Sequence, residues 1–271
     1  GDLWGQGQSL SFYTFSYFVL GEPEKAIETS SRAVELLEQA GDVWEANMAR
    51  MMNTWSLYHA GDLRGAFRQI KRVLVIGKEV GDYSAMAIAL CFWNQIDPQS
   101  APEGEMQIEA ERPREDTTSG ALAIQGRGLE ILFRENDPQR AAQVLQDSLD
   151  LCRKKGIRNV CVFASATWKV TALRIAAEQE PAGPARQNVI SQGRKAARTA
   201  LGITKQYRTC RAHLLRECGL LETLAENAQK AQKYFDESIE LAEQQGARRE
   251  RARSQLARAE AGIQFGWPDA E

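Results

Sequence analysis

A tight turn followed by apolar residues at helical spacing is the clearest pattern in this chain. After the turn at Gly21–Glu24, apolar residues recur at helical spacing and form one stripe, at Ala26, Ile27, Ala33, Val34 and Leu37. Charged residues take much of the rest, among them Glu28, Arg32, Glu35 and Glu38. The pattern predicts an amphipathic helix. Pro23 suits its first turn, where a missing N–H has no partner to lose, and Gly41 suits its end.

The same pattern returns along the chain. An alanine near the start of the predicted helix precedes a closing glycine by 15 positions in each copy, in the pairs Ala26 and Gly41, Ala66 and Gly81, Ala141 and Gly156, and Ala231 and Gly246. Recurrence of a turn, a small residue and a fixed helix length is typical of a helical repeat. We therefore predict an all-α array of about 12–13 helices.

The turns divide the chain into helix pairs. We expect complete repeats, an irregular one rich in proline and acidic residues, and an incomplete one at the end. In order they cover residues 3–41, 43–81, 82–118 (irregular), 119–156, 158–202, 204–246 and 248–271 (incomplete). Because an array ends on a polar capping helix and this one stops within a repeat, we expect a fragment of a longer protein.

Period and anatomy resemble the tetratricopeptide family, whose repeat is about 34 residues with a small residue early in the second helix. Ala26, Ala66, Ala141 and Ala231 match that position, and Ala33, Val73, Ser148 and Ser238 match the small position seven residues later. Gly219 matches the small position of the first helix. The longer period resembles the C-terminal helical sensor arrays of large bacterial multidomain signalling ATPases and kinases. The resemblance implies one domain over 1–271, a right-handed superhelical solenoid of antiparallel helix pairs.

Composition gives no sign of a membrane or nucleic-acid protein. The chain has 271 residues, 43% of them hydrophobic, and a net charge of −2. Five cysteines, an odd number without a CxxC pair, indicate reduced and mostly buried thiols. The apolar run from Leu10 to Leu20 is too short to span a bilayer. We expect a cytoplasmic protein with no membrane partner, and nucleic acid is not the expected partner.

The chain carries no recognisable catalytic motif. Its two histidines, His59 and His213, are far apart in sequence, and neither has ligands at metal-binding spacing. A phosphate-binding loop, a GxSxG elbow and an HExxH helix are all missing from the sequence. We therefore predict no catalytic residues, no metal site, no cofactor and no enzyme activity.

Two sets of residues are candidates for binding a partner. In tetratricopeptide arrays the first helices line a concave groove, and counting back from the anchor alanines places Phe15, Phe18, Met51, Trp55 and Tyr58 there. Aromatic and methionine side chains in a groove suit an apolar helix or peptide. The alternative is that these residues are ordinary core.

The second candidate is basic. From Pro181 to Arg216 there is no acidic residue, and the predicted partner-binding residues there are Arg194, Lys195, Arg198, Arg208 and Arg211. Such a face suits an acidic protein, a phosphate-bearing ligand or nucleic acid. The alternatives are a solvated basic surface, or neutralisation by the acidic segment 103–116 folding across the concave face.

These features favour a non-catalytic protein-interaction or sensory scaffold of a bacterial signalling or regulatory protein. It would bind a protein, peptide or ligand in the superhelix groove and contact neighbouring domains of the same polypeptide. The alternative function is binding of nucleic acid or a phosphate ligand through the basic face 186–216. Exposed apolar residues of an uncapped last helix, Leu256, Ile263 and Phe265, predict self-association through the ends.

Overall fold

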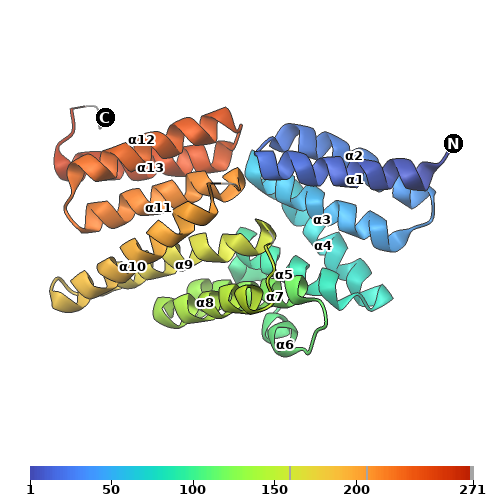
Figure 1. Ribbon diagram of the computed structural model, residues 1–271, viewed down its shortest axis with the longest axis horizontal. Helices are drawn as coiled ribbons and strands as arrows, with labels where there is room; N and C mark the ends of the chain where they lie inside the picture. Colours follow the sequence, from blue (N-terminus) through green and yellow to red (C-terminus); the bar gives the residue numbers. More distant parts are fainter. Residues whose placement is uncertain (159, 206, 269–271) are drawn as a thin grey trace.

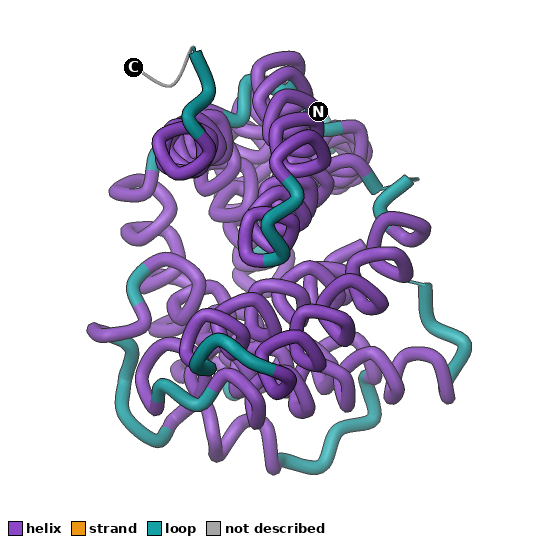
Figure 2. Tube along the Cα trace, turned by 90° about the vertical axis from the view of Figure 1, so that its left-hand side faces the viewer, coloured by secondary structure: helices purple, strands orange, loops and turns teal. Residues whose placement is uncertain are grey.

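The computed structural model describes residues 1–158, 160–205 and 207–268, and within them it is helical, with no β-strand (Figure 2). Thirteen α-helices occupy these residues. They are α1 Leu3–Leu20, α2 Pro23–Gln39, α3 Val43–Ala60, α4 Leu63–Val80, α5 Tyr83–Ile96, α6 Glu105–Glu111, α7 Thr117–Glu130, α8 Pro138–Lys154, α9 Val160–Gln179, α10 Pro184–Ile203, α11 Arg211–Leu224, α12 Ala228–Gln244 and α13 Arg248–Phe265. Short η1 Pro98–Ser100, η2 Ile131–Glu135 and η3 Arg208–Cys210 adjoin them.

The helices pack in chain order, each against the next (Figure 1). The short α6 is the exception, because α5 packs directly against α7 and α6 lies beside both. The odd-numbered helices also contact one another in succession, from α1 through α13. We call these odd-numbered helices the inner row. The chain is thus an all-helical array with sequential neighbour packing, which is compatible with a helical repeat.

The turns between paired helices share one backbone conformation. The first turn residue has positive φ in each case, +79° at Gly21, +91° at Gly61, +54° at Asn136 and +56° at Glu226. This left-handed conformation reverses the chain at the end of a helix. The side chain of Asp62 then accepts a hydrogen bond from the Gly65 amide, at 2.8 Å, and caps the next helix. The turn therefore recurs because a residue of positive φ ends one helix and a nearby side chain can cap the next.

Two repeats also share an unusual buried contact between helices. Ser148 Oγ donates to the Ala121 carbonyl at 2.8 Å, and Ser238 Oγ donates to the Ala212 carbonyl at 2.6 Å. Each serine contacts a third helix as well, through hydroxyls at 3.0 Å and 2.8 Å, on Ser165 and Ser254 respectively. The four anchor alanines are fully buried. The predicted small positions are therefore the places where helices approach closely.

The irregular span 82–118 contains α5, η1 and α6. Two of its carboxylates are paired locally: Glu105 with Lys78 at 2.6 Å, and Glu109 with Arg112 and Arg114. The alternative in which this acidic segment crosses the array to the basic residues of 186–216 is therefore wrong. The short α6 instead lies against α5 and α7.

The two ends of the array touch. In Figure 1 the blue helices of the first repeats and the orange helices of the last ones meet, and α3 contacts α13 while α1 contacts η3. Arg249 Nη1 donates to Tyr58 Oη at 2.9 Å, with its guanidinium 4.7 Å from the ring centroid. Gln245 Nε2 donates to the Arg208 carbonyl at 3.1 Å, beside the turn at Gly21. These contacts close the inner row on itself.

The described cysteines are free thiols. Cys91, Cys152 and Cys218 are buried and Cys210 is half-buried, whereas Cys161 lies outside the described side chains. Burial raises the pKa of Cys91, Cys210 and Cys218 to about 12 in each case, so these thiols stay protonated and unreactive. None of the described helices is both long and apolar enough to cross a bilayer.

Candidate binding groove

The inner face of the array encloses only a small cavity. Every odd-numbered helix contributes to its lining, which includes Trp55 of α3, Trp168 of α9, His213 of α11 and Glu250 of α13. Its volume is about 40 Å³. Protein pockets for small molecules are typically about 300–1,000 Å³. This cavity is therefore too small for a typical small-molecule ligand in this conformation.

The predicted groove residues lie in this closed interior. Phe18, Met51, Trp55 and Tyr58 are buried, and Phe15 is half-buried against the same core. The Trp55 ring is 5.2 Å from the Phe18 ring and 5.0 Å from the Phe92 ring, measured between centroids. These side chains hold three inner helices together. The structure thus packs Phe18, Met51, Trp55 and Tyr58 into the core, with Phe15 at its edge.

An ionic network crosses the closed interior. Arg216 is 2% exposed and binds Glu250 of α13 and Glu217, the latter at 3.1 Å. Arg174 Nε contacts Glu217 at 2.9 Å from α9. Although burial opposes ionisation, Arg174, His213 and Arg216 together hold the pKa of Glu217 well below its usual value. The network is internally paired and serves to join α9, α11 and α13.

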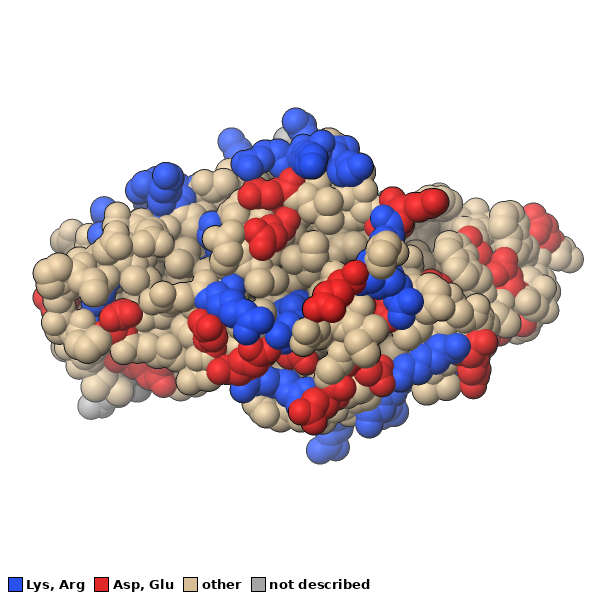
Figure 3. Space-filling view, turned by 90° about the horizontal axis from the view of Figure 1, so that it is seen from below, with Lys and Arg blue, Asp and Glu red and all other residues tan. Residues whose placement is uncertain are grey.

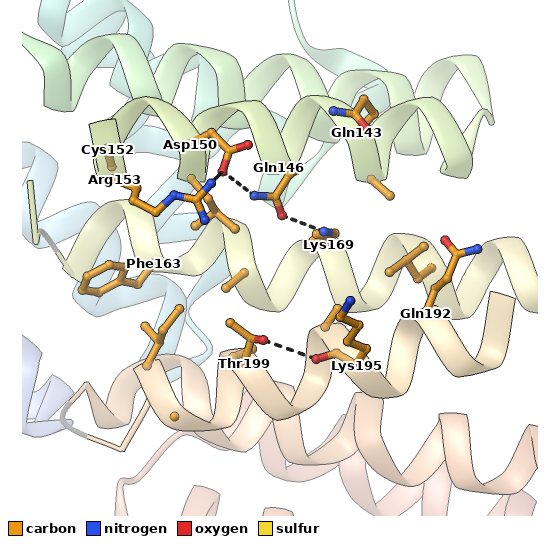
Figure 4. A pocket seen from close by; sticks show the side chains of 18 of the residues that line it. Gln143, Gln146, Asp150, Cys152, Arg153, Phe163, Lys169, Gln192, Lys195 and Thr199 are labelled. Atoms are coloured by element: carbon orange, nitrogen blue, oxygen red, sulfur yellow. Dashed lines mark hydrogen bonds and ion pairs between the residues drawn. The ribbon is translucent and has the colours of Figure 1, made fainter. Parts of the chain in front are cut away.

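A larger hollow lies outside the inner row, between α8 and α10, with α9 as its floor (Figure 4). We call it the α8–α10 groove; its volume is about 1200 Å³. The wall on α8 presents Gln139, Gln143, Gln146 and Asp150, and the wall on α10 presents Asn188, Gln192, Lys195 and Thr199. Both rows have the spacing i, i+4, i+7 and i+11, which is one face of a helix. Two matching polar walls therefore face each other.

The floor of the groove is apolar at its ends and cationic in its middle. Phe163 lies at one end, with its ring centroid 4.9 Å from that of Tyr207. Leu173 is buried at the other end of the floor, and Val189, also buried, lines the groove from the α10 wall. Between these ends lies Lys169, whose ammonium donates to Gln146 Oε1 at 2.6 Å. Along α9 a bound chain would thus meet Phe163, then Lys169, then Leu173, and the charged side chains of Arg153, Arg158 and Glu180 also line the groove.

The charges around Lys169 leave the centre of the groove positive. Asp150 accepts from Gln146 at 2.6 Å and from Arg153 at 2.8 Å. Burial lowers the pKa of Lys169; Asp150 raises this pKa and Lys195 lowers it further. In Figure 4 the Lys195 side chain extends from α10 toward Lys169. Among the described residues Lys195 has no ion-pair partner, so two ammonium groups share this space with one already engaged carboxylate.

The predicted basic residues differ in exposure and in the partners they contact. Lys195 lines the groove, and Arg198 and Arg208 are exposed. Arg194 is bound by Glu222, with Nε to Oε1 at 2.9 Å, and Arg211 donates to the Leu201 carbonyl at 3.2 Å. The structure therefore brings only one of the five, Lys195, into the groove. Arg194 and Arg211 have partners within the fold.

None of the α8 residues in the groove was among the predicted sites. The available signal was the identical polar spacing on α8 and α10. It was missed because each row by itself is indistinguishable from the solvated face of an amphipathic helix. Only the structure shows that the two rows face each other across α9.

One face of the molecule carries mixed charge at its centre and basic side chains along its upper edge in Figure 3. On the face seen from below, acidic and basic side chains alternate across the centre (Figure 3). Within the described part of the chain, no three His, Cys, Asp or Glu side chains come together as a metal site requires. No protein-family model matches the chain, and no curated protein sequence matches it significantly. The groove itself is therefore the basis for a functional hypothesis.

Proposed function

We propose that the chain is a non-catalytic helical-repeat interaction module that holds a segment of a partner protein in the α8–α10 groove. The observation that carries this proposal is the groove, about 1200 Å³ in volume and flanked by matched polar walls. This volume exceeds the range of about 300–1,000 Å³ that is typical of small-molecule pockets, so the groove has room for a polypeptide segment. The tetratricopeptide resemblance supports a right-handed superhelical solenoid, and a setting within a cytoplasmic bacterial signalling protein.

The closed ends give this module a means of reporting occupancy. A segment wedged between α8 and α10 changes the angle at which these helices lie on α9. Because each repeat contacts its neighbours, that change passes along the array. It reaches the contacts between the first and last repeats, including Arg249 on Tyr58. In this mechanism, binding strains or relaxes the contacts between the first and last repeats, and no chemical step is involved.

Site-specific photocrosslinking tests the proposed function. A photoreactive amino acid at Gln192, an exposed position on the α10 wall, should capture one discrete protein segment in native cytosol. The matched control is Gln39, which is exposed at the end of α2 and far from the groove. Gln143→Trp on the opposite wall should weaken the Gln192 product by narrowing the groove. Identical products at Gln192 and Gln39, or products insensitive to Gln143→Trp, would contradict the proposal.

A second function is favoured by the exposed cations near α10. Lys195, Arg198, Lys205 and Arg208 are exposed and make no ion pair among the described residues. The phosphate groups of a ligand or of nucleic acid would bind to these positively charged side chains. The affinity of such a ligand would fall linearly with salt on a double logarithmic plot, with a slope of about 0.7–0.9 per neutralised phosphate. Binding of single-stranded DNA with no such salt dependence would exclude this alternative.

A further inference from the structure

We propose that the occupant of the α8–α10 groove is an extended peptide segment with one acidic residue flanked at positions −2 and +2 by large apolar residues. This inference rests on the proposed function and specifies its ligand. It is argued from the chemistry of the walls, the spacing along the floor and the charge at the centre.

The walls favour an extended main chain. In an extended segment the N–H and C=O groups point sideways, toward both walls, while alternate side chains point to the floor. Asn188 and Gln192 on α10 make no hydrogen bond with other described residues, so their amides are available. Gln143 on α8 donates through Nε2 to Asp147 at 3.0 Å and keeps its amide oxygen free to accept. A helical ligand would satisfy its own main chain and leave these amides unused.

The floor fits the proposed spacing. Phe163 and Leu173 are ten positions apart on α9, which at 1.5 Å per residue is about 15 Å. In an extended chain, positions −2 and +2 are about 13 Å apart. Both side chains then point to the same face as the central residue. Apolar residues at −2 and +2 therefore reach the two apolar ends while the central side chain lies over Lys169.

The centre of the groove favours a carboxylate. Lys169 on the floor and Lys195 on the wall direct ammonium groups into the same space. Two acidic side chains line the groove: Asp150 is held by Gln146 and Arg153 on α8, and Glu180 accepts from Gln139 at 3.3 Å. A ligand carboxylate between the two lysines would accept charge-assisted hydrogen bonds from both. A basic ligand residue there would be repelled, because it would add a third positive charge beside the ammonium groups of Lys169 and Lys195.

Selection of random linear peptides displayed on phage tests the inference on the whole chain. On the unaltered protein we expect enrichment of peptides with a central Asp or Glu and apolar residues two positions to either side. Lys195→Glu changes an exposed side chain, so folding is preserved, and should shift the selected central residue from acidic toward basic. Lys154 is also exposed near the end of α8 but does not line the groove, so Lys154→Glu is the matched control.

A synthetic peptide from the selection then tests the lysine pair quantitatively. Replacing its acidic residue by the corresponding amide should weaken binding about tenfold, as should Lys169→Met, because a charge-assisted hydrogen bond is lost in each case. The two changes together should cost little more than either one. Nuclear Overhauser contacts of the bound peptide should be those of an extended chain.

The outcomes separate the inference from the proposed function. Peptides that are selected but lack the acidic residue, bind as helices or ignore Lys195→Glu would overturn the inference and leave a peptide-binding groove. Selected peptides that bind the Gln143→Trp variant and the unaltered protein with equal affinity would bind outside the groove. That result, or no enrichment at all, would overturn both.

Discussion

Thr209 donates a hydrogen bond from Oγ1 to the main-chain carbonyl of Phe18 at 2.7 Å, although 191 positions separate the two residues. Thr209 lies in η3, at the start of the α11 repeat, and Phe18 lies in the last turn of α1. An open helical array has contacts only between neighbouring repeats, and its ends fray independently. This bond instead ties the first repeat to one of the last. Most contacts in the array are between neighbouring helices, so this hydrogen bond adds a constraint between segments that are far apart in the sequence.

Thr209→Val tests the closure directly. It removes the donor with almost no change in volume, and we expect a loss of about 1 kcal/mol in the free energy of unfolding. Hydrogen–deuterium exchange should rise at both the end of α1 and η3, because the two sides of the contact loosen together. Thr199→Val, at an exposed position of α10, is the control and should be near neutral. Faster exchange at η3 alone would show that the contact does not couple the ends.

Arg216→Met should be severely destabilising. Arg216 is 2% exposed and compensates Glu250 and Glu217, which are themselves buried. Removing one partner of a buried ion pair strands the opposite charge, at a cost of about 3–5 kcal/mol. Chemical denaturation measures the loss. The control is Arg251→Met, because Arg251 is half exposed and its one ion pair among the described residues is with Glu243 at the surface. A loss below about 1 kcal/mol would mean that the network contributes little to stability.

The repeat was predictable because its causes are local. A turn residue such as Asn136 at positive φ and an anchor such as Ala141 act within a few positions of themselves, so their spacing in the sequence carries the pattern. Ser148 and Ser238 match the small position only loosely by residue type. Their hydroxyls nevertheless stabilise the close packing of the two helices, because they donate hydrogen bonds to carbonyls of the neighbouring helix.

The closure and the groove were not predictable in the same way. The contact of Tyr58 with Arg249 depends on the small rotation between successive repeats, summed over the whole array. The total rotation over the array cannot be predicted from any local pattern of residues in the sequence. It decides that Trp55 faces a closed interior and not an open groove. The groove likewise depends on how far α10 lies from α8, so Gln146 and Lys195 resemble any other polar surface residues until both helices are placed.

Two helical glycines offer a matched test of the packing. A Cβ at Gly219 of α11 would lie 2.6 Å from the Phe235 ring, whereas a Cβ at Gly202 of α10 would meet nothing within 4 Å. Alanine is the better helix former at both positions. We therefore expect Gly202→Ala to stabilise by about 0.5–1 kcal/mol. Gly219→Ala should destabilise by about 1–3 kcal/mol through overpacking. Equal effects in urea titrations would contradict the close approach of α11 and α12.

Stability should fall as the pH drops below neutral, because the interior histidines resist protonation. His59 lies 5.5 Å from the rings of Phe18 and Tyr58, and burial lowers its pKa from 6.5 to about 4. Burial, with Arg216 nearby, also lowers the pKa of His213. A histidine whose pKa is lower in the folded state binds protons preferentially in the unfolded state. Stability is therefore fully present above about pH 6.5 and is lost as the pH falls toward 4.

For His59 alone the loss amounts to about 3 kcal/mol, from the difference between 6.5 and about 4. Glu250, whose pKa Arg216 and other cations hold below its usual value against the effect of burial, adds a further loss below its unfolded pKa near 4.5. Urea denaturation at a series of pH values measures both. His59→Gln removes one titrating group and should flatten the profile between pH 6.5 and 4, while leaving the decline at lower pH. A variant profile parallel to the original would show that His59 keeps its ordinary pKa in the folded protein.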